Sequence, residues 1–253
     1  MFSREAFRMM QTDIKIVTPE ESGRLVECSN ASPAQKRFMI SVIREGSTFY
    51  HDFGNGEVCI LDVSHFFNHG VDIPLMQGVA AELSLGASRW DSNVALTAAS
   101  GGNIVTYSFC QAAGIERMVY APKKPSIIHQ RNGAHVAGAH SYTGGSGADM
   151  AVAKTLLKPG DRVVWVDDFL DTGKMTKGAV DLIEQSGAEL VGCVYAVDKI
   201  YAGGREKVDK ILTTMGLPHD RQLAFISIVA MEEGIVQFEG FEEAFTLLRE
   251  SNN

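Results

Sequence analysis

Apolar positions along this chain form short runs that alternate with amphipathic stretches, most regularly between residues 93 and 229. Runs of this kind, bounded by Gly, Pro, Ser and Asp, are typical of buried strands, and the stretches between them of helices. The pattern predicts strands at 94–98, 117–121, 162–166, 190–197 and 223–229, with one helix ending at 113 and another over 174–186. Such a strand–helix rhythm predicts a doubly wound α/β fold with a mostly parallel sheet.

The N-terminal part is less regular. Residues 1–32 carry no strong pattern, whereas Ser32-Pro33 is a typical start for a helix over 34–45. Residues 47–57 are expected to form a loop or hairpin, and residues 76–85 a second helix.

Residues 122–147 are rich in Gly, Ser, His and Lys and are expected to form a long loop outside the core. Long loops inside compact domains usually carry function. Residues 148–157 are ambiguous between strand and helix by periodicity.

Composition narrows the class of protein without identifying a function. The chain has 253 residues, enough for one large domain or for a core with an appendage. Its net charge of −8 argues against nucleic acid as a partner. No apolar stretch is long enough to cross a bilayer, and the N-terminus lacks a secretory apolar core, so we expect a cytoplasmic protein without a membrane partner. The four scattered cysteines are expected to be reduced thiols, and the seven histidines show no metal-ligand spacing.

The clearest chemical signal lies at residues 161–174, which read Asp-Arg-Val-Val-Trp-Val-Asp-Asp-Phe-Leu-Asp-Thr-Gly-Lys. An apolar run ends in adjacent acids, Asp167 and Asp168, and a turn then leads into the expected helix. Ligands of parallel sheets bind where strands end and helices begin, and a helix start offers N–H groups to a phosphate. Paired acids commonly just close a solvated strand end, but beside this turn they suit sugar hydroxyls or a metal ion. Together these features predict a phosphoribosyl ligand.

The run Val-Asp-Asp-Phe-Leu-Asp-Thr-Gly-Lys resembles the signature of type I phosphoribosyltransferases, which bind phosphoribosyl pyrophosphate. In that family the adjacent acids hold the ribose hydroxyls, and the loop after them wraps the 5-phosphate. The resemblance implies that Asp167 and Asp168 serve catalysis by holding the ribose. The residues that would form or flank the phosphate cradle are Phe169, Leu170, Asp171, Thr172, Gly173, Lys174, Met175 and Thr176.

The resemblance also suggests a catalytic role for Asp171. Related enzymes that act on 6-oxopurines carry an acid here that can take the N7 proton of the base as N9 attacks C1 of the ribose. The alternative is an acid favoured by the helix dipole alone.

The resemblance spans residues 58–240 and is greatest to the bacterial xanthine phosphoribosyltransferases. It is carried by Leu61 to Met76, by Gly178 and residues 182–188, by Asp198-Lys199 and by Gly204-Arg205. It implies that Lys199 donates to the 6-oxo group of the base, and that Asn68 and the backbone near Leu61 enclose the purine. The alternative for Lys199 is a solvated lysine at a strand end.

The same resemblance implies a small hood above the core. We therefore expect an N-terminal extension and helical segment at 1–57, a hood and base-binding segment at 58–90, and a core at 91–253 that contributes C-terminal strands to the hood.

A pyrophosphate-binding loop is expected directly after the first core strand. There the resemblance places Ala99, Ser100 and Gly101, in a loop that often includes a non-proline cis peptide bond. Lys123 and Lys124, next to the long loop, would neutralise the pyrophosphate. Two departures stand out: Ala98-Ala99 replace an acid that is usual near the start of the loop, and Gly144 stands where a lysine is often present.

The resemblance implies a purine phosphoribosyltransferase, an enzyme of the pentosyltransferase class that serves purine salvage. It would join xanthine, guanine or hypoxanthine to phosphoribosyl pyrophosphate, giving the purine 5′-mononucleotide and pyrophosphate. Mg²⁺ would arrive with the substrate, no protein metal site is expected, and the family usually forms homodimers. Two alternatives stay open: a non-catalytic regulator that binds phosphoribosyl pyrophosphate or nucleotide, which both departures favour, and an adenine phosphoribosyltransferase. Lys199 disfavours the second, because a lysine donor mismatches a 6-amino group.

Overall fold

The computed structural model describes residues 14–52, 56–122, 127, 133–139 and 148–248. The chain divides into two compact units. Unit 1 takes its described residues from 1–78, 199–202 and 226–253, and unit 2 takes its described residues from 79–198 and 203–225.

Unit 2 contains a parallel sheet in the order β9–β8–β4–β5. Its strands are β4 (Val94–Ala98), β5 (Arg117–Ala121), β8 (Arg162–Leu170) and β9 (Glu189–Lys199). Because all four run the same way, the carboxyl ends of β4 and β8 meet at one edge of the sheet. This edge is where an open α/β sheet places its ligands.

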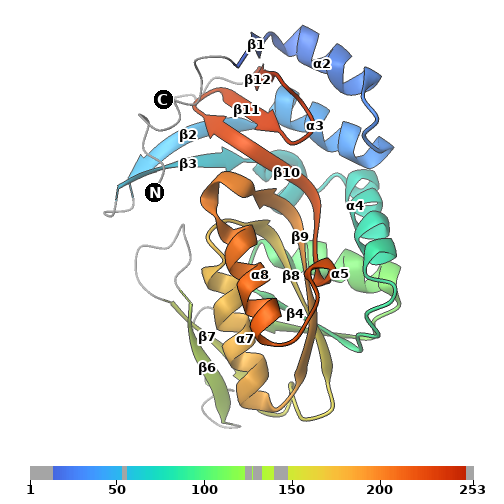
Figure 1. Cartoon of the computed structure of the whole chain (residues 1–253), viewed down its shortest axis with the longest axis vertical. Coiled ribbons are helices and arrows are strands. Elements are labelled where there is room, and N and C mark those ends of the chain that lie inside the picture. Colours follow the sequence, from blue (N-terminus) through green and yellow to red (C-terminus); the bar gives the residue numbers. More distant parts are fainter. Residues whose placement is uncertain (1–13, 53–55, 123–126, 128–132, 140–147, 249–253) are drawn as a thin grey trace. The chain divides into compact units, whose positions relative to one another are not determined.

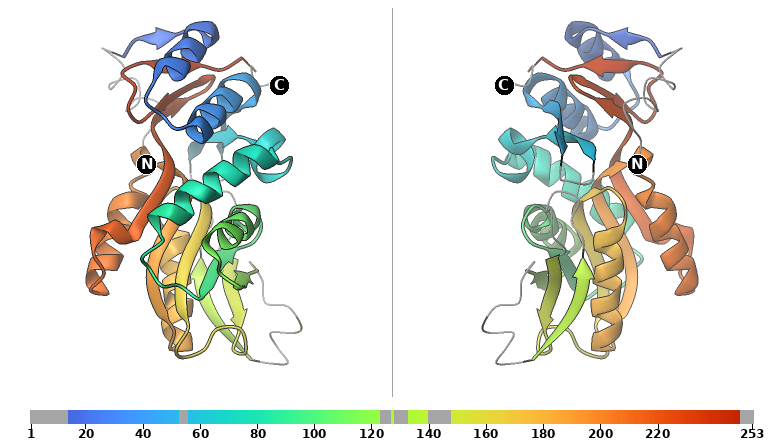
Figure 2. Two further views of the ribbon diagram at one scale, coloured as in Figure 1. Left: turned by 90° about the vertical axis from the view of Figure 1, so that its right-hand side faces the viewer. Right: turned by 90° about the vertical axis from the view of Figure 1, so that its left-hand side faces the viewer.

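Three helices accompany this sheet: α5 (Gly102–Ala113), α7 (Lys174–Ser186) and α8 (Gly204–Thr214). In Figure 1, α5 lies on one side of the strands, and α7 and α8 lie on the other. The two turned views in Figure 2 agree with this arrangement. The core between the layers includes the fully buried side chains of Trp165, Tyr195, Phe109 and Leu96. The predicted doubly wound, mostly parallel α/β fold is therefore confirmed.

A separate two-stranded sheet joins β6 (Ala134–Ala139) and β7 (Ala148–Ala153) antiparallel to each other. Helix α7 packs beside it, and Gln185 of that helix bonds the backbone of Val136 in both directions, at 2.9 and 3.2 Å. The expectation of an unbroken loop over 122–147 is therefore wrong for 134–139, where pairing with β7 creates a strand.

Unit 1 pairs strands that lie far apart along the chain. The strand β1 (Ile16–Val17) runs parallel to β12 (Ala244–Thr246), which pairs antiparallel with β11 (Ile235–Phe238), and β11 pairs with β10 (Gln222–Glu232). A second hairpin joins β2 (Ser47–Asp52) to β3 (Glu57–Asp62). The predicted hairpin in this region is confirmed, and its tip at 53–55 lies outside the described residues.

The helices of unit 1 are α2 (Pro19–Cys28), α3 (Pro33–Glu45) and the beginning of α4 (Ile73–Gly86), which continues into unit 2. The predicted start of α3 is confirmed, because Ser32 and Gln35 form a reciprocal capping box. Helix α2 was not predicted, although Thr18 caps it and Pro19 opens it. The described residues also include the short helical turns η2 (Ser64–Asn68), η3 (Ile200–Ala202) and η4 (His219–Arg221).

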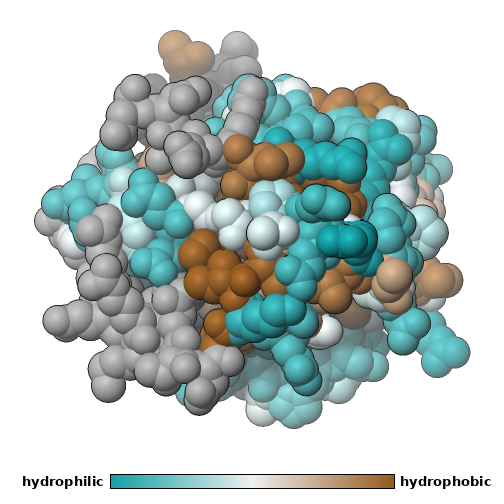
Figure 3. All heavy atoms as spheres, turned by 90° about the horizontal axis from the view of Figure 1, so that it is seen from above, coloured by the Kyte–Doolittle hydropathy of each residue, from teal (hydrophilic) through white to brown (hydrophobic). Residues whose placement is uncertain are grey.

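All four cysteines are free thiols, as expected. None of the helices in the described ranges combines the length and the apolar character needed to cross a bilayer. The face drawn in Figure 3 mixes apolar and polar residues, which is ordinary for a folded protein.

Candidate active site

The acidic pair lies near the carboxyl end of β8. Val163 to Val166 before it are fully buried, and Asp167 is also buried, with 8% of its surface exposed. Asp168 is half-buried, and its backbone N–H donates to the Asp167 carboxylate at 3.1 Å.

Two glycines at the start of α5 bring its backbone against these acids. A side chain at Gly101 would collide with the carboxylate of Asp168. One at Gly102 would collide with the Thr97 hydroxyl and would lie 2.9 Å from Asp167 Oδ1. The loop after β4 and the acids of β8 therefore border the same space.

The two acids make this space costly for further negative charge. Burial, together with the charge of Asp168, raises the pKa of Asp167 well above its ordinary value. Burial also raises the pKa of Asp168, and repulsion from Asp171 acts in the same direction. A ligand that donates hydroxyl hydrogen bonds, or that carries a cation, would stabilise the ionised form of both acids.

The loop after β8 ends at a helix start suited to a phosphate. Gly173 caps α7 with φ = 73°, a left-handed conformation that glycine adopts without steric cost. It supplies no side-chain cap, so the N–H groups of the first turn keep their capacity to bind an anion. Asp171 and Thr172 are half-buried, and Lys174 is exposed. Phe169 and Met175 are half-buried, while Leu170 is buried.

Thr176 is placed differently from the other members of the predicted phosphate cradle. Its side chain is buried, and its hydroxyl forms a 2.7 Å hydrogen bond with the hydroxyl of Tyr195 in β9. Burial raises the pKa of Tyr195 well above its ordinary value and that of the neighbouring Cys193 thiol to about 12, so neither group ionises near neutral pH. Thr176 thus anchors the first turn of α7 to strand β9.

Helix α8 also packs against the loop between β8 and α7, residues 171–173, which is called the phosphate loop below. A side chain at Gly204 would collide with the carbonyl oxygen of Asp171 and would lie 2.9 Å from Leu170 Cδ1. Lys207 Nζ donates to the Thr172 carbonyl at 3.3 Å. The sequence did not lead us to predict helix α8 or the role of Tyr195. The one feature that could have pointed to Tyr195 is that it is an aromatic residue within an otherwise aliphatic strand.

The expected pyrophosphate loop connects β4 to α5. The peptide bond between Ala99 and Ser100 is cis, which agrees with the resemblance. Ser100 is exposed, Ala99 is half-buried, and the Ala99 N–H is held by the carbonyl of Ala121 at 3.1 Å. Lys123, Lys124 and Gly144 lie outside the described residues.

The residues predicted to contact the base belong to unit 1. Leu61 is buried in β3, and Lys199, the last residue of β9, is 7% exposed. Asn68 ends the short helix η2, and its Oδ1 lies 3.1 Å from Nδ1 of His69. The neighbouring Phe66 and Phe67 are buried with their rings edge-on to Phe38, at centroid distances of 6.0 and 5.3 Å, so they pack in the core.

The donor set at the acidic pair fits Mg²⁺ carried by a substrate. Mg²⁺ prefers oxygen ligands and is usually bound by one or two protein carboxylates together with substrate phosphates and water molecules. Asp167 and Asp168 offer such oxygens. Across the described ranges, no three His, Cys, Asp or Glu side chains cluster so that they alone could hold a metal ion.

Comparison with known proteins gives matches over most of the chain. The family described as "Phosphoribosyl transferase domain" matches residues 107–222. Xanthine phosphoribosyltransferase 2 of Clostridium botulinum is 31% identical over 158 residues, 60% of this chain and 80% of that protein. The xanthine phosphoribosyltransferase of Latilactobacillus sakei is 33% identical over 179 residues, 71% of this chain and 87% of that protein.

Solved structures share the fold at lower identity. An adenine phosphoribosyltransferase from Trypanosoma brucei matches with a TM-score of 0.60 and 16% identity, covering 79% of this chain and 81% of that chain. One from Thermoanaerobacter pseudethanolicus matches with a TM-score of 0.55 and 16% identity, covering 72% and 95%. At such identities the likeness concerns the fold alone, and it confirms the predicted type I phosphoribosyltransferase fold.

Proposed function

This chain belongs to the phosphoribosyltransferase family as a purine phosphoribosyltransferase, and we propose that the base it takes is a 6-oxopurine. The reaction would join xanthine, guanine or hypoxanthine to phosphoribosyl pyrophosphate. Its products would be the purine 5′-mononucleotide and pyrophosphate, which is the chemistry of purine salvage.

One observation supports phosphoribosyl pyrophosphate as the shared substrate: within unit 2, Asp167 and Asp168 near the end of β8 (the twin acids) are followed closely by a glycine-capped helix start. The carboxylates and the N–H groups of the helix start suit different parts of this substrate. Carboxylates accept hydrogen bonds from the ribose 2′- and 3′-hydroxyls, while the N–H groups of the first turn of α7 hold the 5-phosphate. A ligand with both groups on one pentose matches this arrangement.

Each remaining part of the substrate has a candidate partner. The backbone from Ala99 to Gly101 would hold the pyrophosphate, with Lys123 and Lys124 supplying positive charge. Mg²⁺ bound with the substrate would neutralise the developing charge on the leaving group. N9 of the base attacks C1 of the ribose, pyrophosphate leaves with the bonding electrons, and Asp171 would accept the N7 proton.

The preference for a 6-oxopurine rests on Lys199 and on the relatives. A lysine ammonium donates hydrogen bonds and accepts none, so it suits an oxo group and mismatches an amino group. Both relatives described above carry the name xanthine phosphoribosyltransferase. Asn68 and the backbone near Leu61 would enclose the ring. We further propose a homodimer in the cytoplasm.

The test is pyrophosphate release with phosphoribosyl pyrophosphate, Mg²⁺ and a panel of xanthine, guanine, hypoxanthine and adenine. We expect turnover with at least one 6-oxopurine and much less with adenine. Preference for adenine would overturn the base assignment.

A regulator that binds without turnover is the second candidate, favoured by Ala98-Ala99 in place of the usual acid. Calorimetric binding of phosphoribosyl pyrophosphate, run beside the activity panel, separates the two. Tight binding with no pyrophosphate release from any base would favour the regulator.

A further inference from the structure

An ion pair between Asp198 and Arg205 lies at the place where β9 ends and α8 begins. Arg205 Nε is 2.5 Å from Asp198 Oδ2. The Asp198 side chain is fully buried, and the Arg205 side chain is 40% exposed. A buried carboxylate is strongly destabilising without a cationic partner, so this pair fixes the path of the chain between its two residues.

The acid of the pair is placed beside the phosphate loop. In the register of the sheet, Asp198 lies opposite Leu170, the last residue of β8 and the first residue before the loop. Lys199 is the next residue along the chain, so its backbone position depends on where Asp198 is held.

Arg205 lies in the first turn of α8, which packs against the same loop. It directly follows Gly204, which packs against the Asp171 carbonyl so closely that no side chain fits between them. Two residues further on, Lys207 donates to the Thr172 carbonyl. The segment from Asp198 to Lys207 therefore meets the phosphate loop at both of its ends.

We infer that Asp198 and Arg205 are positioning residues that hold the phosphate loop and the attachment point of Lys199 in one register. Neither needs to touch the substrate. Their effect passes through Gly204 to the loop and through the peptide bond to Lys199. The inference deepens the proposed function and rests on it for the role of Lys199 toward the base.

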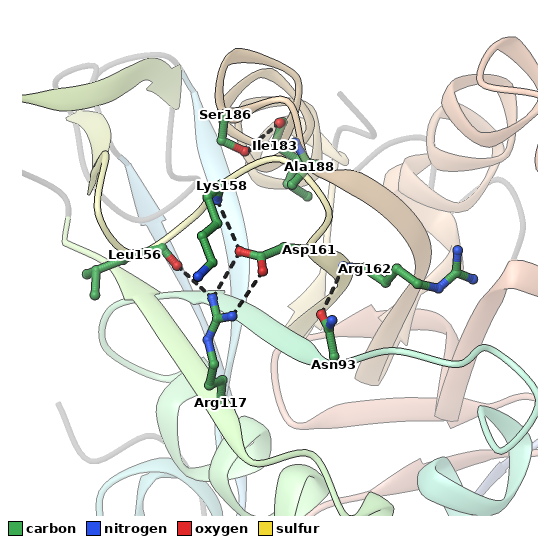
Figure 4. Close-up of polar contacts among 9 residues, drawn as sticks. All are labelled: Asn93, Arg117, Leu156, Lys158, Asp161, Arg162, Ile183, Ser186 and Ala188. Atoms are coloured by element: carbon green, nitrogen blue, oxygen red, sulfur yellow. Dashed lines mark hydrogen bonds and ion pairs between the residues drawn. The ribbon is translucent and has the colours of Figure 1, made fainter.

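The chain offers a matched control pair at the opposite end of the same sheet. Arg117, at the start of β5, forms two 2.9 Å hydrogen bonds to Asp161, just before β8 (Figure 4). The side-chain exposures are 42% for Arg117 and 4% for Asp161, close to those of the Arg205 pair. The Lys158 N–H and the Leu156 carbonyl complete this cluster at 3.0 Å each. Its arginine is thus equally placed to stabilise a buried acid, but far along the strands from the twin acids.

The experiment compares R205A, R205K and R117A in the full chain. Thermal unfolding measures stability, and steady-state kinetics at a temperature well below every midpoint measures kcat and KM for both substrates. We expect R205A and R117A to lower the unfolding temperature to a similar extent. Only R205A should also lower kcat/KM for both the purine and phosphoribosyl pyrophosphate, by about tenfold or more, since misplaced binding groups lose rate steeply. R205K should recover much of that loss, because lysine can still pair with Asp198.

A second measurement covers the case in which R205A folds poorly. D198N keeps the size of the side chain and removes its charge, and the rise in unfolding temperature on adding phosphoribosyl pyrophosphate reports loop competence without turnover. That rise should be smaller in D198N and unchanged in R117A.

The results distinguish a failure of the proposed function from a failure of the positioning role. If the unmodified protein neither turns over any purine nor binds phosphoribosyl pyrophosphate, the proposed function is wrong. If it is active but R205A and R117A have the same kcat/KM, the positioning role is wrong and the pair is structural only.

Discussion

Thr176 and Tyr195 join their hydroxyl groups in a 2.7 Å hydrogen bond inside the core of unit 2. Both side chains are buried, with 1% and 0% of their surfaces exposed. Thr176 belongs to the first turn of α7 and Tyr195 to β9, so this bond ties the helix that begins at the phosphate loop to the sheet beneath it.

Removing both partners of this bond should cost less than the sum of removing each alone. Tyr195→Phe leaves the Thr176 hydroxyl buried without its partner, at a cost of roughly 1–3 kcal/mol in the free energy of unfolding. Combining it with Thr176→Val should cost less than the sum of the two single changes. Denaturant titration of the four proteins measures the coupling. Strictly additive losses would mean that the two hydroxyls do not depend on each other.

Replacing the half-buried acid should impair the phosphoribosyl substrate. Asp168→Asn should lower kcat/KM for phosphoribosyl pyrophosphate by an amount equivalent to about 1–3 kcal/mol, the scale for losing a hydrogen bond to a charged group. Asp181→Asn on α7 is the control, because that acid forms a surface ion pair with exposed Lys177 at 3.0 Å. Unchanged kinetics in Asp168→Asn would contradict the ribose assignment.

The twin acids should give the ligand-free protein an unusual dependence of stability on pH. The pKa of Asp167 is raised in the folded state, so the folded protein keeps a proton that the unfolded chain releases. The stability from this group is present below the ordinary Asp pKa of about 3.9 and is lost as pH rises through the raised value. Asp167→Asn lacks this loss, so its unfolding free energy relative to the unmodified protein should improve from pH 4 to pH 7.

Asp161 should show the opposite sign. Its hydrogen bond to Arg117 holds the pKa of Asp161 below its ordinary value, so its contribution to stability is present above about 3.9 and is lost as pH falls through the lowered value. Asp161→Asn should therefore be most damaging near neutral pH. Denaturant unfolding at several pH values tests both variants, and parallel pH profiles for the two would refute the assigned pKa directions.

Truncating Lys199 should affect the base more than the sugar. Lys199→Ala should raise KM for the oxopurine while leaving calorimetric binding of phosphoribosyl pyrophosphate nearly unchanged, because the ammonium is proposed to meet only the base. Lys210→Ala on α8 is the control, an exposed lysine in the neighbouring helix. Equal losses for both substrates in Lys199→Ala would show that the lysine does not read the base.

Local signals predicted much of the core because they act within a few residues. The helix over 174–186 was predictable from Gly173 and Gly187, which both adopt the left-handed conformation at its ends. The strands at 94–98 and 117–121 were predictable because they are short, mainly apolar runs with glycine or proline nearby. The acid pair was recognisable for the same reason, since its chemistry and its turn lie within one short stretch.

What escaped prediction depends on partners distant in the chain. Strand β6 contains mainly Ala, Gly and His, which do not favour strands, and forms by pairing with β7. The side chain of Thr176 faces Tyr195 and not the loop, and this follows from how α7 packs on β9. The contact of Gly204 with Asp171 likewise arises only once α8 is folded against the loop.

The short parallel pairing of β1 with β12 makes the order of each of these strands depend on the other. The Ala244 N–H donates to the Lys15 carbonyl at 3.0 Å, and Ile16 and Val17 lie in register with Ala244 and Phe245. An exopeptidase that digested the C-terminus past Ala244 would release the N-terminal strand as well, although more than two hundred residues separate them along the backbone. Removing either strand therefore also removes the pairing partner of the other.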